Sequence, residues 1–132
     1  MKARVSIVIV DENGADLPVF KRLVTEFVGS HVMCFPTQEA AERECATNAP
    51  DIFIIDDPDT HDVPMSFDPH FRERPGLRDA LIVLLSSRDG PLPDQARSSG
   101  VDVFLPKPVD TKFFMAMLHQ ALKLRAARAA IA

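Results

Sequence analysis

Residues 50–59 read PDIFIIDDPD, a stretch in which four apolar residues run directly into a cluster of acids. The apolar part is short, rich in isoleucine and apolar at every position, as in a strand buried on both faces of a parallel sheet. Three carboxylates follow it, at Asp56, Asp57 and Asp59, and repulsion among ionised carboxylates costs free energy. The stretch therefore predicts a buried strand over residues 51–55 and raises the question of what holds three carboxylates at its end.

Similar apolar runs flank this strand on both sides along the chain. They predict four further strands, over residues 5–10, 31–35, 80–86 and 101–105. Segments with helical periodicity lie between them, over residues 17–29, 37–48 and 93–100, and a last helix follows Asp110. Thr37 and Asp110 are the expected N-caps of two of these helices. The alternation predicts an α/β fold, a doubly wound five-stranded parallel sheet with helices on both faces.

Composition limits the classes of protein that the chain can represent. Its 132 residues fit one domain, and 15 basic against 19 acidic residues give a formal net charge of −4. That balance argues against direct nucleic-acid binding, which needs a basic face. No apolar run is long enough to span a membrane, and no signal-peptide cleavage site follows the first strand, so we expect a cytoplasmic protein. Cys34 and Cys45 are expected to be reduced thiols, although their positions leave a disulfide open.

Residues 57–79 interrupt the regular pattern. This segment contains four prolines and little periodicity, which predicts a loop with a short or irregular helix between Met65 and Arg74. His61 and His70 lie in it among acids, but their spacing matches no standard metal-ligand motif. We interpret them as solvated loop histidines.

Polar residues of complementary chemistry follow four of the predicted strands. They are Asp11 and Glu12, Asp56 with Asp57, Ser86, and Lys107. In an open parallel sheet the carboxyl ends of the strands share one edge, and ligands bind there. A divalent cation such as Mg²⁺ would offset the repulsion among the acids, and a hydroxyl with an ammonium group would suit a phosphoryl group beside it.

Each of these residues also has an ordinary structural explanation. Asp11 and Glu12 could form a solvated turn, Ser86 could cap a helix, and Lys107 could be a surface charge. Their joint occurrence at the ends of four separate strands favours a functional site over four unrelated coincidences.

Four motifs of the chain resemble those of the receiver domain of two-component response regulators, the CheY-like family. They are IVIVDEN (7–13), PDIFIIDD (50–57), IVLLSS (82–87) and GVDVFLPKP (100–108), in the family's order and at its usual spacing. The resemblance implies a flavodoxin-like sheet with strand order 2-1-3-4-5. It also implies a receiver domain over residues 1–124, followed by a helical tail, 125–132, that could lead to an effector domain.

The resemblance assigns the phosphoacceptor and the metal ligands. Asp56 matches the aspartate that accepts the phosphoryl group. Asp11 and Glu12 match the acidic pair that holds Mg²⁺, directly or through water. Pro58 occupies the position whose backbone carbonyl binds Mg²⁺, and proline retains that carbonyl. The family often has a proline four residues after the acceptor, where this chain has Thr60, so the loop departs from the common pattern.

The resemblance also assigns phosphoryl contacts and a switch. Lys107 matches the lysine that contacts the phosphoryl oxygens, and the backbone N–H groups of Asp57 and Ser87 match further phosphoryl contacts. Ser86 matches the Ser/Thr switch position, and Phe104 matches the aromatic residue that moves inward on activation.

These assignments imply a response-regulator receiver rather than an enzyme. It would accept a phosphoryl group on Asp56 from a sensor histidine kinase or a phosphotransfer protein, with Mg²⁺ as cofactor. The protein would catalyse only its own phosphorylation and dephosphorylation. The new charge would change the surface of the fourth helix, fifth strand and last helix, which would signal to an effector domain or partner protein and could form a homodimer.

Two other interpretations stay open from the sequence. The proline-rich 57–79 segment is compatible with a receiver-like interaction module that acts without phosphorylation. A haloacid-dehalogenase-like phosphatase also uses an aspartate after a strand, with a Ser/Thr and a Lys around Mg²⁺. Its DxDxT motif is nearly matched by DPDTH (57–61), but the threonine comes one place early. The nucleophile would also follow the third strand rather than the first.

Overall fold

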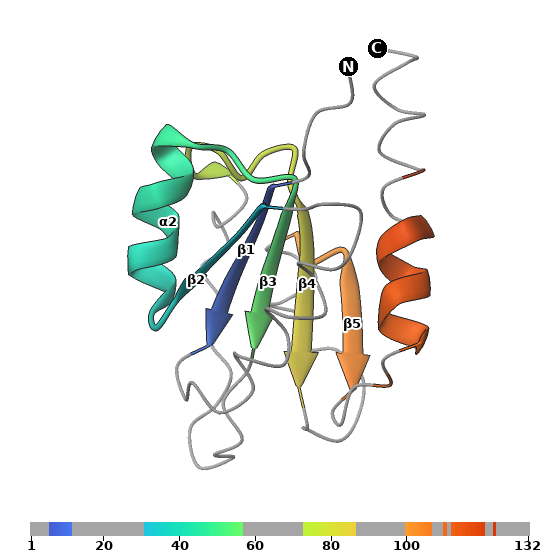
Figure 1. Ribbon diagram of the computed structural model, residues 1–132. Helices are drawn as coiled ribbons and strands as arrows, with labels where there is room; N and C mark the ends of the chain where they lie inside the picture. Colours follow the sequence, from blue (N-terminus) through green and yellow to red (C-terminus); the bar gives the residue numbers. More distant parts are fainter. Residues whose placement is uncertain are drawn as a thin grey trace.

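The computed structural model describes residues 6–11, 31–56, 73–86, 100–106, 110, 112–120 and 123. Its strands are β1 (Ser6–Asp11), β2 (His31–Phe35), β3 (Ile52–Asp56), β4 (Leu81–Ser86) and β5 (Val103–Pro106). They form one sheet in the order β2-β1-β3-β4-β5, and every neighbouring pair is parallel (Figure 1). The predicted five-stranded parallel sheet is therefore confirmed, together with its strand order.

β2 has the predicted bounds, and the boundaries of the other strands differ from the predicted ones by one or two residues. We expected Asp11 and Asp56 just after their strands. Instead β1 and β3 include them, because these two residues still pair across the sheet. β3 begins one residue later than predicted and β5 begins two residues later. The residues before these strands, Asp51 and Asp102, make hydrogen bonds with neighbouring strands instead of continuing their own.

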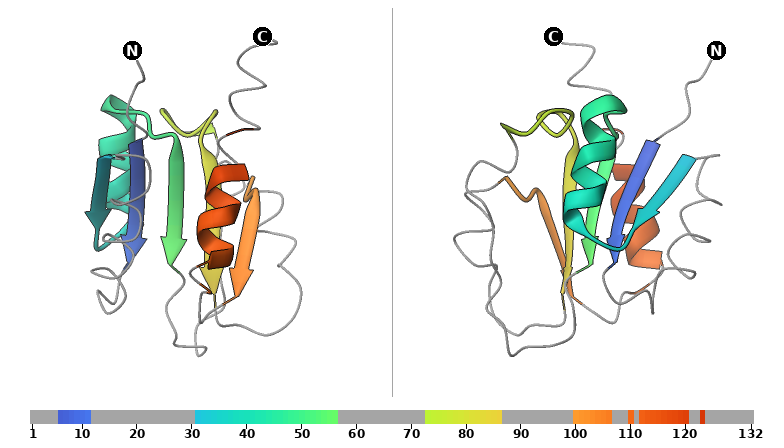
Figure 2. Two further views of the ribbon diagram at one scale, coloured as in Figure 1. Left: turned by 45° about the vertical axis from the view of Figure 1, so that its right-hand side comes forward. Right: turned by 90° about the vertical axis from the view of Figure 1, so that its left-hand side faces the viewer.

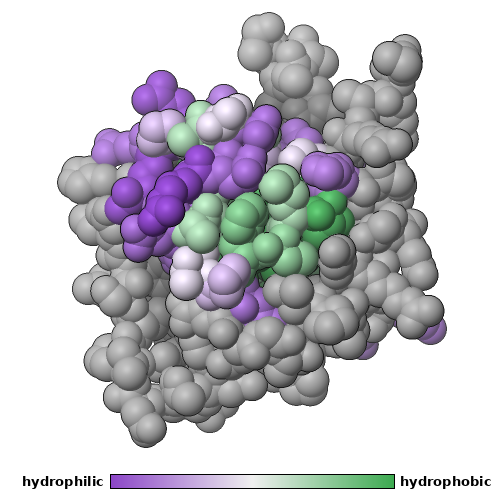
Figure 3. Space-filling view, turned by 60° about the vertical axis from the view of Figure 1, so that its left-hand side comes forward, coloured by the Kyte–Doolittle hydropathy of each residue, from purple (hydrophilic) through white to green (hydrophobic). Residues whose placement is uncertain are grey.

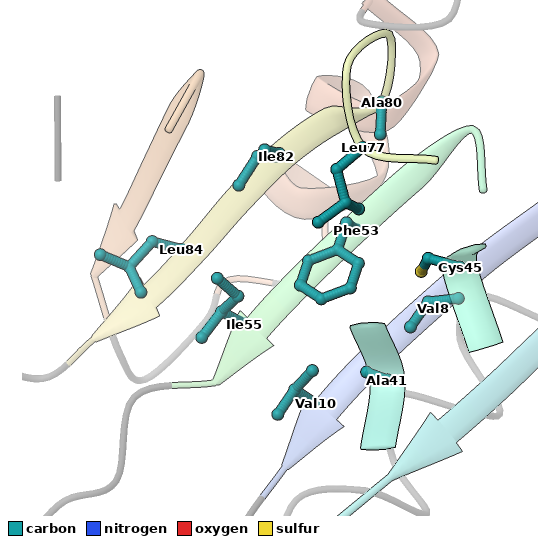
Figure 4. Packing of buried hydrophobic residues seen from close by; sticks show 10 residues of the cluster. All are labelled: Val8, Val10, Ala41, Cys45, Phe53, Ile55, Leu77, Ala80, Ile82 and Leu84. Atoms are coloured by element: carbon teal, nitrogen blue, oxygen red, sulfur yellow. The ribbon is translucent and has the colours of Figure 1, made fainter. Parts of the chain in front are cut away.

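The sheet separates two hydrophobic cores, because the strands bury apolar side chains on both faces. One core joins alternate residues of β1, β3 and β4 to the helix at 112–120; its fully buried members include Ile7, Ile54 and Phe114. The other lies under α2 (Gln38–Thr47), on the opposite face (Figure 2). Figure 4 shows this second core, in which Phe53 lies between the sheet, α2 and Leu77.

α2 begins at a polar cap and faces the sheet through small side chains. The hydroxyl of Thr37 accepts a hydrogen bond from the Ala40 N–H at 3.1 Å, which confirms the predicted N-cap. Ala41 and Cys45 are buried against β1 and β3, so the helix can pack closely. Its outer side is charged and forms part of the hydrophilic area in Figure 3, beside a compact apolar area of the same face.

The turn that precedes β4 packs directly on α2. Gly76 has a left-handed φ of 86°, and a Cβ added to it would lie 1.9 Å from the Cys45 carbonyl oxygen. Only glycine therefore fits at this contact. Next to it, Leu77 is fully buried in the core under α2, and Arg74 forms an ion pair with Glu42.

The helix at 112–120 covers the other face of the sheet. Asp110 Oδ1 accepts a hydrogen bond from the Phe113 N–H at 3.0 Å, which confirms the second predicted N-cap. Phe114 and Leu118 point into the core, whereas Phe113 is 60% exposed. Within the described residues, no helix is long and apolar enough to cross a membrane.

Several predicted elements lie outside the described residues. They are the helices over residues 17–29 and 93–100, most of the proline-rich 57–79 segment, and the tail, 125–132. Gly100, the residue expected to close the second of these helices, is described and has a left-handed φ of 97°. That conformation is typical of the residue that follows a helix.

Candidate functional site

The site is built from the last residues of the two central strands. Asp11 ends β1, Asp56 ends β3, and the two are register partners in the parallel pairing of these strands. Both are nearly inaccessible, with 2% and 4% of their surface exposed. Because neighbouring strands lie about 4.8 Å apart, the register places the two carboxylates side by side at the carboxyl edge of the sheet.

Strand alternation assigns both carboxylates to the same face. Ile7 and Ile9 precede Asp11 at two-residue intervals and belong to the core under the helix at 112–120. Ile52 and Ile54 stand in the same relation to Asp56 and belong to the same core. Since side chains alternate between faces along a strand, Asp11 and Asp56 share the face of this helix.

Two adjacent buried carboxylates suit a hard divalent cation. Within the described part of the chain, the buried atoms Asp11 Oδ2 and Asp56 Oδ1 accept no hydrogen bond, although both residues make other interactions. Positive charge between them would offset their repulsion, and Mg²⁺ is commonly held by one or two carboxylates with waters. The described residues contain no group of three or more His, Cys, Asp or Glu side chains that could hold a metal. Any third His, Cys, Asp or Glu ligand would therefore have to come from outside them.

Ser86 and Phe104 form a second pair, on the other face of the sheet. Ser86 is fully buried at the end of β4 and is the register partner of Pro106. Phe104 is the register partner of Leu84, two residues before Ser86, and packs against the core under α2. Alternation therefore brings the two predicted switch residues to one face, while the acids share the other.

Five of the predicted site residues lie outside the described residues. They are Glu12, Asp57, Pro58, Ser87 and Lys107. Each directly follows a described strand, or lies within two residues of its end. The histidines of the proline-rich segment, His61 and His70, are also outside the described residues.

Two further aspartates with defined roles lie at the opposite edge of the sheet, and we did not single them out from the sequence. Asp51 Oδ2 accepts a hydrogen bond from the Ser6 N–H at 2.8 Å, and Asp102 Oδ2 accepts one from the Ile82 N–H at 2.9 Å. The carboxylate thus accepts from the first residue of β1 in one case and from the second residue of β4 in the other. The sequence signal is an aspartate just before an apolar run.

The two cysteines lie in different chemical environments on opposite faces of the sheet. Cys34, on β2, packs against the core under the helix at 112–120, whereas Cys45 is buried in the core under α2. Burial, with the charges of Glu44 and Glu42, raises the pKa of the Cys45 thiol to about 11. Cys45 therefore stays protonated at neutral pH and acts as a small apolar side chain.

Comparisons with known proteins identify the fold. No protein-family model and no curated protein matches the chain. Among solved structures, a CheY-like receiver domain from Methanospirillum hungatei JF-1 matches with a TM-score of 0.75 and 17% identity, covering 96% of this chain and 99% of that one. The chemotaxis protein CheY4 of Vibrio cholerae matches with a TM-score of 0.73 and 16% identity, covering 90% and 99%.

A third similar structure contains a metal ion. It is the receiver domain of the sensor histidine kinase PA1611 from Pseudomonas aeruginosa PAO1, with a TM-score of 0.71, 17% identity and coverage of 92% of this chain and 99% of that one. In that protein a magnesium ion is coordinated in the active site cleft. Together with the strand order, these matches show that the chain has the CheY-like receiver fold of response regulators.

Proposed function

We propose that this protein is a phosphoacceptor switch that takes up a phosphoryl group on Asp56 in a Mg²⁺-dependent reaction. The observation that carries the proposal is the burial of Asp11 and Asp56 as register partners at the carboxyl edge of the sheet. The receiver fold is typical of such switches and supports the same conclusion. The donor would be a phosphohistidine on a sensor histidine kinase or a phosphotransfer protein.

In this proposal the Asp56 carboxylate is the nucleophile. One of its oxygens forms a bond to phosphorus in line with the leaving group, while the phosphorus–nitrogen bond of the donor phosphohistidine breaks and the imidazole leaves with its electron pair. Lys107 would contact the phosphoryl oxygens. Asp57 and Ser87 would each contribute a backbone N–H to the same oxygens.

Asp11 and Asp56 would hold the metal, with Glu12 and the Pro58 carbonyl as further ligands. When bound, Mg²⁺ supplies positive charge that offsets the charge of the acids and of the incoming phosphoryl group. β1 pairs with β2 up to Val10 and with β3 up to Asp11, so the backbone that carries Asp11 is held in the sheet. A rigid strand end of this kind suits a site that must be formed before the donor arrives.

Ser86 and Phe104 would transmit the modified state. Both lie on the face of α2, and Phe104 packs at the margin of that core. Movement of the Ser86 hydroxyl toward a phosphoryl group on Asp56 would leave space that the Phe104 ring can enter. The receiving surface would be that of the fourth helix, β5 and the last helix, which would bind an effector domain, a partner protein or a second copy of the chain.

The decisive experiment is incubation with acetyl phosphate and Mg²⁺, followed by intact-mass measurement. The expected result is one added phosphoryl group in the parent protein, and no added mass in Asp56→Asn or without Mg²⁺. Asp110→Asn is the matched control, because it also removes one aspartate charge but keeps a side chain that can cap the helix. It should be modified like the parent.

The alternatives predict different results in this and two related experiments, beryllofluoride binding and hydrolysis of a phosphomonoester. A receiver-like interaction module would bind no beryllofluoride, would gain no mass with any donor and would be unaffected by Asp56→Asn. A phosphatase would release phosphate from a phosphomonoester in many turnovers. Either result would overturn the proposal.

A further inference from the structure

The register of β1 against β3 decides whether Asp11 and Asp56 lie side by side. In many sheets one face is apolar and the other polar, so a slipped register would bury polar groups and is disfavoured. Here both faces of the two strands are apolar: Ile7 and Ile52 belong to one core, and Val8 and Phe53 to the other. The alternation of polar and apolar residues therefore distinguishes registers only weakly, which leaves a role for polar contacts at the strand ends.

Asp51 supplies such a contact at the amino end of both strands. Its N–H donates to the Ser6 carbonyl at 2.8 Å, and its Oδ2 accepts from the Ser6 N–H at 2.8 Å. The Asp51 carbonyl also accepts from the Leu81 N–H at 2.9 Å, so this residue links β1, β3 and β4. The side-chain bond is the part that needs an acceptor at position 51, because any residue provides the backbone bonds.

We propose that Asp51 is a positioning residue for the Asp11–Asp56 pair, setting the register of β1 against β3 from the opposite edge of the sheet. Four consecutive register pairs, from Ile7–Ile52 to Val10–Ile55, separate the contact from the acids. A one-residue slip would place Asp56 opposite Val10 or beyond the end of β1, and would move Asp11 to the other face relative to it. The inference rests on the proposed function only where it concerns metal binding.

Asp102 provides a matched control in the same sheet. Its Oδ2 accepts from the Ile82 N–H at 2.9 Å and its N–H donates to the Ile82 carbonyl at 2.9 Å, so the contact repeats that of Asp51. It acts between β4 and β5, which carry Ser86 and Phe104 but neither member of the acid pair. Removing Asp102 should therefore cost similar stability without changing the pairing of Asp11 and Asp56.

The first test is Mg²⁺ affinity of the parent, Asp51→Ala, Asp51→Asn and Asp102→Ala. Calorimetry is suitable, because the chain has no Trp or Tyr to report binding by fluorescence. Asp51→Ala should bind Mg²⁺ about tenfold more weakly, as when supporting contacts of a metal site are removed. Asp51→Asn should recover most of the affinity because its side-chain carbonyl can accept the Ser6 N–H, and Asp102→Ala should stay within about twofold of the parent.

A purely structural role for Asp51 predicts a different pattern. Asp51→Ala and Asp102→Ala would then lose similar stability, and both would bind Mg²⁺ as the parent does while folded; that result would overturn the inference. If Asp51→Ala is unfolded, Asp51→Ser takes its place, because its shorter side chain weakens the same bond and should shift affinity in the same direction.

The second test reads the register without metal. Cross-strand nuclear Overhauser effects between β1 and β3 should show the Val8–Phe53 and Val10–Ile55 pairs in the parent. In Asp51→Ala these nuclear Overhauser effects should weaken, or further ones should appear between residues paired in a shifted register. In Asp102→Ala they should be unchanged. If the parent binds no Mg²⁺, the proposed function fails but this test still stands; if the pairs are equally strong in Asp51→Ala, the inference itself fails.

Discussion

The two edges of the sheet use the same residue type in opposite ways. At the amino edge, the carboxylates of Asp51 and Asp102 each accept a hydrogen bond from a backbone N–H of a neighbouring strand. At the carboxyl edge, Asp11 and Asp56 are buried next to each other, and each has an oxygen to which no described group donates. At the amino edge, hydrogen-bond donors stabilise each negative charge, whereas at the carboxyl edge two negative charges lie next to each other and repel.

This difference separates structural acids from a candidate site. A carboxylate that accepts backbone N–H groups at a strand start contributes to the fold, and its charge is part of that contribution. Adjacent buried carboxylates repel each other, and a cation between them would offset that repulsion. The sign of the effect of removing one charge should therefore differ between the two edges.

The largest expected effect is at the carboxyl edge, on adding Mg²⁺. At about 100 times its Kd, Mg²⁺ should raise the free energy of unfolding of the parent by ~2.7 kcal/mol. Most of this gain should be lost in each of the variants Asp11→Asn and Asp56→Asn. When no metal is present, each variant should be more stable than the parent by about 1–3 kcal/mol, because one of two repelling charges is removed. Urea unfolding followed by circular dichroism, with and without Mg²⁺, measures both; a metal-free loss of stability in these variants would contradict the comparison.

At the amino edge the same measurement should give the opposite sign. Asp51→Ala and Asp102→Ala should each lower the free energy of unfolding by about 1.5–3 kcal/mol, since a hydrogen bond to a charged acceptor is lost and a partly buried N–H is left without it. The Asn variants should lose about 1 kcal/mol, because they keep an acceptor without its charge. Neutral or stabilising Ala variants would show that the two edges do not differ.

The smallest expected effect concerns the Cys45 thiol, a buried ionisable group that lies at neither edge of the sheet. The Cys45 thiol has a pKa of about 11 in the folded protein against an ordinary 9.0, so its contribution to stability is complete below pH 9. As the pH rises above 9 the unfolded thiol ionises while the folded one does not, and stability should fall by under ~1 kcal/mol at about pH 9.5. The difference between the parent and Cys45→Ala over this range isolates the effect; parallel pH profiles would refute it.

Much of the fold was predictable because its signal is local. Each apolar run, such as residues 5–10 and 101–105, marks a strand, and their alternation with helical periodicity leads to a parallel sheet. The boundaries were less predictable, because a strand continues for as long as its backbone pairs with a neighbour. Asp11 and Asp56 are polar but still pair, so the strands extend to include them.

The site was predictable in part for the same reason. Parallel strands bring their carboxyl ends to one edge, which places Asp11, Asp56 and Ser86 there without knowledge of any contact. The contacts at the other edge depend on register, which joins Ser6 to a residue 45 positions away. The close approach of Gly76 to Cys45 likewise joins two segments whose packing no local pattern shows.

The separation of the two cores has a consequence for communication across the molecule. Ile54 and Ile55 are neighbours in sequence but belong to different cores, and the sheet between these cores is filled by the backbone of paired strands. Among the described residues, packing changes on one face therefore have no direct side-chain route through the sheet to the other. The proposed acceptor, Asp56, lies on the face of the helix at 112–120, whereas the proposed switch residues lie on the face of α2. Conformational coupling between them would therefore act at the carboxyl ends of the strands, where Asp56 ends β3 and Ser86 ends β4.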